Sequence, residues 1–294
     1  MSFQFRSSKK LAKLMEVYNI PTIAEVVLKG EEELTGRKPE EVRANMAKRL
    51  QIMKQSAILG KENPKKSKSG LVGGDAKKIE EVDASQLFLS EVMRKAVEYS
   101  IGVMESNARM GKIVAAPTAG SSGILPGAVL AVQECWNLSE EKAVDGLLTA
   151  AGIGIVIANI GTFSAAAAGC QAEVGASSAM AAAAVSAMRG MSAERCINAA
   201  ALALKNLLGL ACDPIGGLVE VPCVKRNGMG VVHALTASDM SFAGITSHIP
   251  FDEVVEAMTN IASHMGEALR ETAKGGLAVT PTAKRITCQS CPHS

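Results

Sequence analysis

The sequence predicts an all-α protein, and three features of its composition carry this prediction. Hydrophobic residues make up 48% of the 294 residues, yet aromatic residues make up only 3%. The cores of β-sandwiches and β-barrels draw on aromatic and β-branched residues in alternation, which this chain supplies poorly. Its apolar residues are chiefly Ala, Val, Ile, Leu and Met, several of which form helices readily. The high apolar fraction and a charged fraction of 20% exclude a disordered chain.

The N-terminal 60 residues are predicted to form short helices. An apolar cluster occupies residues 23–28, and Pro39 then begins a charged amphipathic stretch over 40–55. Residues 60–78 interrupt the helical pattern with Lys, Gly and Ser. That composition is typical of a solvated linker, although the glycines at 70–74 also fit an ordered loop near a site.

Four further helices are predicted from residues that cap helix N-termini. A capping box at 83–86 is expected to begin a helix that ends near residue 107. Ser139, followed by two glutamates, begins the next helix, and the other two are expected over 192–208 and 250–274. No alternation of strand, turn and helix indicates a parallel sheet.

The central residues 146–172 carry no charged side chain. A membrane-spanning helix needs only about 20 apolar residues, so length alone permits one. The stretch is rich in Ala and Gly, however, and it includes the polar residues Asn159 and Gln171. We therefore expect buried helices that pack closely in the core and support a rigid site. Both polar side chains are expected to hydrogen-bond to the residues that form this site and so to hold them in place.

Charge and cysteine usage limit the partners and the compartment. The net charge of +2 gives no broad attraction to nucleic acid or to an anionic membrane, so we expect neither as a partner. The first ten residues are polar and basic, and no apolar run of a secretory signal follows. Seven cysteines in such a chain favour a reduced, cytoplasmic setting. We expect Cys135 and Cys196, which lie in ordinary helical patterns, to be packing residues.

Three other cysteines lie among glycines and prolines. Cys170, Cys212 and Cys223 do not have the paired spacing of zinc knuckles, and the Cys-x-x-Cys pair is Cys288 with Cys291 near the C-terminus. Gly and Pro beside a thiolate let the backbone approach a bulky cluster. From spacing alone, an iron–sulfur site and three buried cysteines both remain open.

The segments around these cysteines resemble a known family. GTFSAAAAGCQAEVGASSAMAAAAV and CDPIGGLVEVPCVKRN are similar to signature segments of the iron–sulfur-dependent L-serine dehydratase alpha chain. APTAGSSGILPG, ETAKGGLAVTPTAK and SGLVGGDAKK resemble further segments of that family. The resemblance covers nearly the whole chain, and it implies that the glycines at 70–74 belong to an ordered part of an enzyme.

The resemblance implies a 4Fe-4S cluster held by Cys170, Cys212 and Cys223. One iron would then lack a protein thiolate and act as a Lewis acid on the hydroxyl of L-serine. Elimination of water would lead to pyruvate and ammonia, a step of amino-acid degradation that feeds gluconeogenesis. A pyridoxal-phosphate route would need a Schiff-base lysine and a phosphate cup, and the cysteine motifs favour the cluster instead. The alternatives are a related L-cysteine desulfidase and a non-catalytic helical scaffold.

Substrate contacts are expected in the Gly-rich segment. Thr118, Ser121 and Ser122 are candidates for holding the substrate carboxylate, although turn formation and helix capping explain the same residues. Related enzymes carry a Ser-Ser-Ser-His segment in their beta part, and this chain has none. The catalytic base therefore remains unknown here, and we expect a beta chain to supply part of the site in a hetero-oligomer.

The resemblance and the composition suggest three regions. Residues 1–74 would be a helical segment and loop that pack on the core, and 75–287 the cluster-binding catalytic domain. Residues 288–294 would form a tail. In single-chain relatives a C-terminal cysteine can occupy the open iron, which makes Cys288 and Cys291 candidate ligands; free thiols in a frayed terminus are the alternative.

Overall fold

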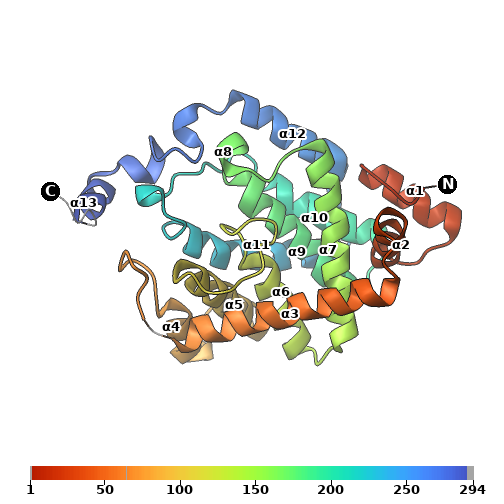
Figure 1. Ribbon diagram of the computed structural model, residues 1–294, viewed down its shortest axis with the longest axis horizontal. Helices are drawn as coiled ribbons and strands as arrows, with labels where there is room; N and C mark the ends of the chain where they lie inside the picture. The colour runs from red at the N-terminus through yellow and green to blue at the C-terminus, as the bar shows by residue number, and fades with distance from the viewer. Residues whose placement is uncertain (1, 64, 290–294) are drawn as a thin grey trace.

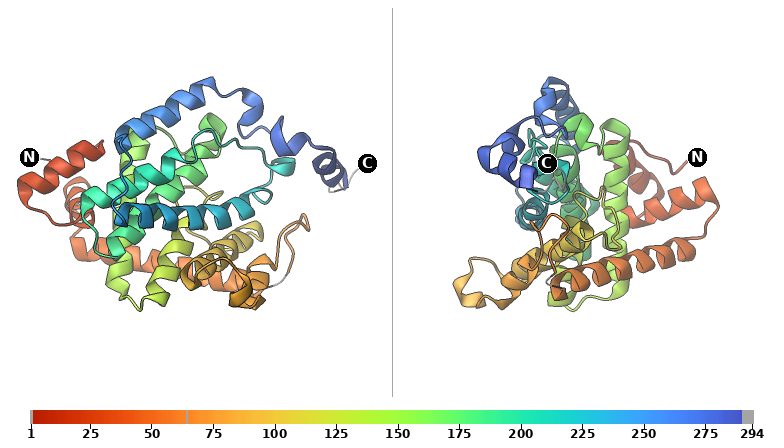
Figure 2. Two further views of the ribbon diagram at one scale, coloured as in Figure 1. Left: turned by 180° about the vertical axis from the view of Figure 1, so that it is seen from behind. Right: turned by 60° about the vertical axis from the view of Figure 1, so that its left-hand side comes forward.

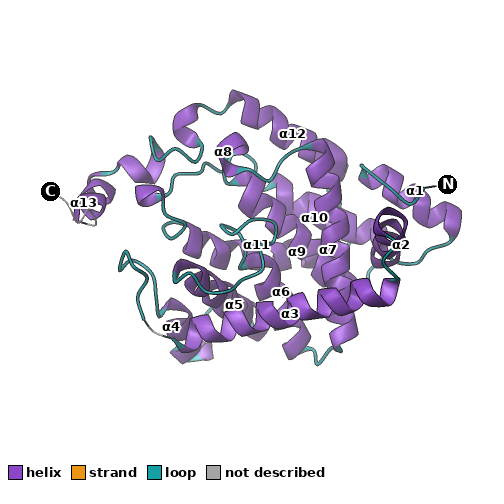
Figure 3. Ribbon diagram, viewed as in Figure 1, coloured by secondary structure: helices purple, strands orange, loops and turns teal. Residues whose placement is uncertain are grey.

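The computed structural model describes residues 2–63 and 65–289. This described part consists of helices and loops and contains no strand, so the all-α prediction is confirmed (Figure 3). The α-helices are α1 (Ser8–Tyr18), α2 (Ile23–Thr35), α3 (Pro39–Glu62), α4 (Asp75–Glu81), α5 (Glu91–Ala108), α6 (Ile124–Cys135), α7 (Glu140–Ile160), α8 (Ala165–Ala168), α9 (Ala176–Met188), α10 (Ala193–Lys205), α11 (Cys223–Phe242), α12 (Phe251–His264) and α13 (Pro281–Gln289). Short turns are η1 (Ala84–Gln86), the π-helical η2 (Gln171–Gly175), η3 (Ile215–Gly217), η4 (Glu267–Leu269) and η5 (Gly276–Val279).

Helix α9 is the centre of the core. It packs against α6, α7, α10 and α11, and residues 181–184, all alanines, are completely buried. Small side chains allow these close approaches: a Cβ atom added to Gly146 of α7 would lie 2.8 Å from the Cγ atom of Met188 on α9. The predicted burial of Ala- and Gly-rich central helices is therefore confirmed.

Helix α7 is long and apolar enough to cross a membrane by length and composition alone. Of its most apolar 18-residue window, 67% is buried inside the protein, where α7 contacts α2, α3, α6, α9 and α12. The helix is therefore accounted for by packing in the protein core, as the sequence indicates.

The N-terminal helices pack on one side of this core. Helix α3 runs across the lower part of Figure 1 and packs against α5, and α2 packs against α7. At the contact between α3 and α5, a Cβ atom on Gly60 would lie only 1.7 Å from the carbonyl oxygen of Gly102, so the two helices meet backbone to backbone. Helices α1 and α13 lie at opposite ends of the long axis (Figures 1 and 2).

Helix boundaries follow the caps in part. The Ser139 and Ser192 side chains cap α7 and α10, as predicted, and Pro39 is the first residue of α3. The capping box at 83–86 was a wrong prediction, because those residues form only the turn η1 and Ser90 caps α5 instead. The helix expected over 250–274 ends at His264, where Met265 adopts an extended backbone conformation.

Candidate active site

Three separate segments bring the predicted cysteine ligands into the interior. Cys170 immediately precedes η2, Cys212 lies in the loop after α10, and Cys223 is the first residue of α11. Their side chains are 2%, 3% and 7% exposed, respectively. The residue before Cys170 is Gly169, whose φ of 71° lies in the left-handed region that glycine tolerates best. This conformation lets the chain leave α8 and turn directly into η2.

Cys170 and Cys212 form a polar pair with a carboxylate beside them. The Sγ atoms of both cysteines and a carboxylate oxygen of Glu173 all lie within 4.8 Å of one another. The Cys212 thiol hydrogen-bonds to Cys170, which lowers the pKa of Cys170 and, together with burial, raises the pKa of Cys212. Arg226 donates a further hydrogen bond to the Cys170 Sγ atom at 3.5 Å. The hydrogen bonds from Cys212 and Arg226 therefore favour the thiolate form of Cys170 over that of Cys212.

Arg226 is fixed by partners on both sides of Cys212. It donates hydrogen bonds to the carbonyl oxygen of Ala211 at 2.9 Å and to Asp213 Oδ1 at 2.8 Å. The other oxygen of Asp213 accepts from the backbone N–H of Leu277, so the C-terminal segment closes over this loop. These hydrogen bonds fix the position of the Arg226 guanidinium. The guanidinium in turn orients the Cys170 sulfur and places a positive charge beside it.

Cys223 lies outside the group of atoms within 4.8 Å, but it belongs to the same region. Burial raises the pKa of its thiol to about 12, and the Cys170 charge contributes to the rise. Three buried cysteines from three segments, with an N–H donor on one sulfur, form a donor set that suits an iron–sulfur cluster, whose sulfur ligands bind different irons. Cys170, Cys212 and Glu173 alone could instead hold a single metal ion.

The Gly-rich turn at residues 118–123 lies against Glu173. Thr118 hydrogen-bonds to the Glu173 carboxylate, and its hydroxyl oxygen is 3.1 Å from that of Ser121. A Cβ atom on Gly120 would be 3.0 Å from a Glu173 carboxylate oxygen, so glycine leaves room for the carboxylate. Ser122 donates to the carbonyl oxygen of Ala119 within the turn. The structure thus brings Thr118 and Ser121 toward Glu173, whereas the Ser122 hydroxyl is engaged within the turn.

Asn227 ties this turn to the helix that begins with Cys223. Its side chain is completely buried and accepts a hydrogen bond from the Gly123 backbone N–H at 2.9 Å. Its amide group donates to the carbonyl oxygens of Gly120 at 2.8 Å and Cys223 at 2.9 Å. We did not identify Asn227 from the sequence, because an asparagine within a helical pattern gives no signal of partners 104 and 107 residues away.

Glu173 was also missed, although one signal was available. It is the only charged residue between Asp145 and Arg189 in the sequence. Burial raises the pKa of its carboxyl group, and the charge of Glu271 adds to this effect, while the Thr118 hydrogen bond acts in the opposite direction. A charged side chain in such a long Ala- and Gly-rich stretch indicates a polar site.

The glycine-rich loop at residues 66–74 packs against the segment that carries Cys212 and Cys223. The hydroxyls of Ser67 and Ser69 both donate to the carboxylate of Glu220, which lies between Cys212 and Cys223. Lys225 forms an ion pair with Asp75 at 2.7 Å. These contacts fit the ordered-loop alternative and do not fit a solvated linker.

Asn159 and Gln171 have different environments. Gln171 is completely buried and bridges two segments, accepting from the Gly209 N–H and donating to the Met258 carbonyl oxygen. Asn159 is exposed and bonds only within its own helix, to the carbonyl oxygen of Ile155. The expectation that both side chains support the site therefore fits Gln171 and was wrong for Asn159.

Of the other described cysteines, Cys135, Cys196 and Cys288 lie outside the group formed by Cys170, Cys212 and Glu173. Cys196 is buried, and burial raises the pKa of its thiol to about 12, as expected for a packing residue. Cys135 is partly buried at the end of α6. Cys288 is exposed on α13, which packs against the η3 turn of the Cys212–Cys223 loop. Cys291 lies outside the described residues, so its proposed role as a ligand is not addressed.

The described histidines have partners or positions away from the cysteines. His233 is within 2.7 Å of the carbonyl oxygen of Ala203, and His264 bonds to the carbonyl oxygen of Asn260 in its own helix. His248 is exposed in the loop before α12. Within residues 2–63 and 65–289, we therefore find no histidine among the polar contacts of Cys170 or Glu173.

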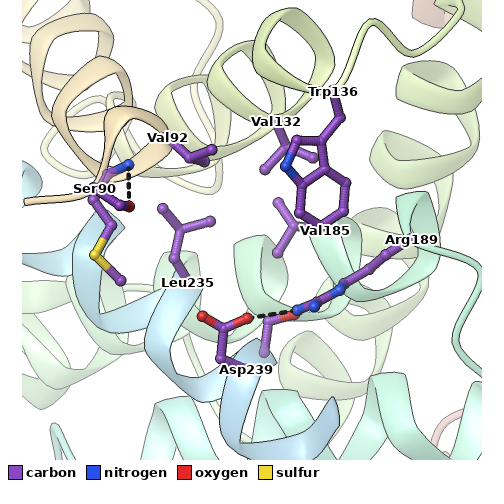
Figure 4. Close-up of a pocket in the computed structure, with 10 residues that line it drawn as sticks. Ser90, Val92, Val132, Trp136, Val185, Arg189, Leu235 and Asp239 are labelled. Atoms are coloured by element: carbon purple, nitrogen blue, oxygen red, sulfur yellow. Dashed lines mark hydrogen bonds and ion pairs between the residues drawn. The ribbon is translucent and has the colours of Figure 1, made fainter.

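A separate cavity of about 160 Å³ lies between α5, α6, α9 and α11 (Figure 4). Its walls are mostly apolar, and Arg189 forms an ion pair with Asp239 at its edge, 2.6 Å long. The Arg189 guanidinium also lies over the ring of Trp136, at 5.2 Å from the ring centroid. The ten residues that line this cavity include none of the predicted site residues, so the cavity is distinct from the cysteine site.

Comparison with known proteins gives a consistent set of relatives. The family described as "Serine dehydratase alpha chain" matches residues 19–278. The "Probable L-serine dehydratase, alpha chain" of Bacillus subtilis (strain 168) is 46% identical over 283 residues, covering 96% of this chain and 94% of the relative. The "L-serine dehydratase, alpha chain" of Peptoniphilus asaccharolyticus is 42% identical, covering 90% and 91%. The "L-serine dehydratase" of Streptomyces coelicolor is 33% identical, covering 95% of this chain but 62% of that relative.

Proposed function

The chain belongs to the serine dehydratase alpha chain family, and from this premise we propose that it is the catalytic chain of an L-serine dehydratase. The reaction removes water from L-serine to give aminoacrylate, which tautomerises and hydrolyses to pyruvate and ammonia. One observation carries the proposal: Cys170 and Cys212 meet in the interior beside a turn rich in hydroxyls and backbone N–H groups. Free thiols at the centre of the site also support a reducing, cytoplasmic setting.

Cys170, Cys212 and Cys223 would hold a 4Fe-4S cluster. When bound, such a cluster would supply an iron without a protein thiolate, which acts as a Lewis acid for the substrate hydroxyl. The hydrogen bond from Arg226 to the Cys170 sulfur supports this assignment, because buried cysteines used only for packing need no cationic donor. The same contact argues against a non-catalytic scaffold with purely apolar cysteines.

The chain's own residues would position the substrate. The Ser121 hydroxyl and the N–H groups of the turn would hold the substrate carboxylate, next to the N-terminus of α6, and Thr118, whose proton goes to Glu173, would orient Ser121. Asn227 would keep this turn in register with the Cys223 segment. The C-terminal segment, which bonds to Cys212 through the Leu269 carbonyl oxygen, would limit the access of water to the cysteines.

The catalytic base would come from a separate beta chain. The alpha-chain relatives have nearly the same length as this protein, whereas the Streptomyces coelicolor enzyme is longer and only 62% of it is matched. An additional part in the longer enzyme is consistent with a second chain here. Assaying pyruvate formation by the chain with and without its beta partner tests this point; full turnover by the alpha chain alone would contradict it.

Replacement of one cysteine tests the proposed function most directly. The Cys212→Ala variant, purified anaerobically with the beta chain, should lose bound iron and sulfide and lose pyruvate formation by at least about 100-fold. Cys196→Ala is the matched control, because it removes another buried thiol that is not part of the group formed by Cys170, Glu173 and Cys212, and this variant should keep both iron and activity. An active Cys212→Ala enzyme without iron would exclude the cluster. Sulfide release from L-cysteine, measured in parallel, separates a desulfidase from a serine dehydratase.

A further inference from the structure

We propose that the carboxylate of Glu173 binds the α-ammonium group of the amino-acid substrate. This inference rests on the proposed function and adds a specificity-determining residue to it. The turn at 118–123 accounts for the substrate carboxylate and the cysteine site for the hydroxyl, but neither explains why an amino acid is preferred over a hydroxy acid. Glu173 supplies the missing contact.

The position of Glu173 connects the two parts of the site. One of its carboxylate oxygens lies within 4.8 Å of the Sγ atoms of both Cys170 and Cys212. On the other side, the carboxylate accepts a hydrogen bond from Thr118 and lies over Gly120, with no side chain between it and the turn. The carboxylate is therefore adjacent to both the cysteines and the proposed carboxylate-binding turn.

The charges around Glu173 lack a cation. Within the described part of the chain, no Lys, Arg or His nitrogen lies within 4.0 Å of its carboxylate, and the nearest cation at the cysteines, Arg226, is bonded to Asp213 and Cys170. The charge of Glu271, which acts on Glu173, is also negative. Burial disfavours the charged form of a carboxylate, and a positive partner beside it favours that form again. The ammonium group of the substrate is the cation that the proposed reaction brings to this place.

The arrangement also matches the chemistry of an α-amino acid. Its ammonium and carboxylate groups are attached to the same carbon, so their binding groups must be neighbours. Thr118 meets this requirement, because its hydroxyl contacts Ser121 in the anion-binding turn and also bonds to Glu173. An ammonium group bound at Glu173 therefore places the substrate carboxylate at the turn and leaves the side-chain hydroxyl to face Cys170 and Cys212.

The test compares two ligands that differ only in the ammonium group. L-Alanine and propanoate both lack the hydroxyl, so their binding does not depend on turnover. Their affinities are measured by calorimetry on the anaerobic enzyme with its beta chain, for the wild type and for Glu173→Gln. Glu271→Gln is the matched control. It removes the same negative charge from an exposed residue whose charge acts on Glu173 but which is not proposed to bind the substrate. Iron content and thermal unfolding establish that each variant is intact.

We expect wild-type enzyme to bind L-alanine more tightly than propanoate. Glu173→Gln should weaken L-alanine binding by at least about 30-fold, the lower end for removing one partner of a buried charge pair, with little change for propanoate. Glu271→Gln should change either affinity by less than about threefold. The KM for L-serine should rise in Glu173→Gln more than kcat falls.

Two results would overturn the inference. The first is an unchanged preference for L-alanine over propanoate in Glu173→Gln. The second is a fall in kcat with an unchanged KM and unchanged ligand affinities, which would assign Glu173 to proton transfer instead. The failure of the proposed function looks different: wild-type enzyme that forms no pyruvate from L-serine would refute the dehydratase activity, while the calorimetry still reports whether Glu173 binds an ammonium group.

Discussion

Asn227 is the clearest place to test how the fold holds the site together. Its side chain is completely buried and joins the turn at 118–123 to the first turn of α11. In Asn227→Ala, the Gly123 N–H and the Gly120 carbonyl oxygen lose the side-chain partner that joins them to α11. The Cys223 carbonyl oxygen lies in the first turn of the helix, where a helical N–H can still satisfy it.

The expected loss of stability follows from these two groups. A buried polar backbone group that loses its partner costs about 1–3 kcal/mol, so Asn227→Ala should lower the free energy of unfolding by about 3 kcal/mol. For a chain of this size, that corresponds to a fall in Tm of roughly 6 °C. Asn227→Asp should be at least as harmful, because it keeps the acceptor for Gly123 but places a carboxylate oxygen against the Gly120 carbonyl oxygen.

Urea unfolding followed by helical circular dichroism measures the effect, with Asn159→Ala as the control. Asn159 is exposed and makes one bond within α7, so its replacement should change the free energy of unfolding by less than about 0.5 kcal/mol. If Asn227→Ala is no more destabilising than Asn159→Ala, the hydrogen bonds of Asn227 do not hold the turn at 118–123 against α11, and the role that we assign to Asn227 is wrong.

Two further predictions concern packing and charge. Gly60→Ala should destabilise the protein by at least about 3 kcal/mol in urea unfolding, because its Cβ atom would lie 1.7 Å from the Gly102 carbonyl oxygen; a gain in stability, as helix propensity alone predicts, would contradict the backbone-to-backbone contact of α3 and α5. Ion pairs with Lys61 and Lys77 lower the pKa of Glu80 to about 2 in the folded protein, so its contribution is present above its usual pKa near 4.5 and is lost as the pH falls toward 2. Glu80→Gln should therefore reduce the free energy of unfolding at pH 7 by about 1 kcal/mol after solvent screening, and the difference from wild type should vanish near pH 2. A difference that persists at pH 2 would show that the two ion pairs of Glu80 are not its source.

The sequence determined the secondary structure and the chemical character of the core because both depend on local properties. Few aromatics and abundant Ala and Leu predict helices, and Ser139 and Ser192 begin α7 and α10 because a serine caps the N–H groups of the residues that follow it. The capping box at 83–86 was misleading for the same reason: a local hydrogen bond forms there, but it is not continued into a helix. The cysteine motifs are also local patterns, so they could be recognised without the fold.

Only the tertiary structure decided which polar groups surround the cysteines. Glu173 reaches Cys212 and the turn at Thr118 because the π-helical η2 begins immediately after Cys170 and directs its carboxylate there. Asn227 finds its partners in a turn more than 100 residues earlier in the chain. The loop around Ser67 resembles a linker in composition but is held by Glu220, 153 residues away. Such contacts depend on how the helices pack, and residue spacing along the chain does not encode that packing.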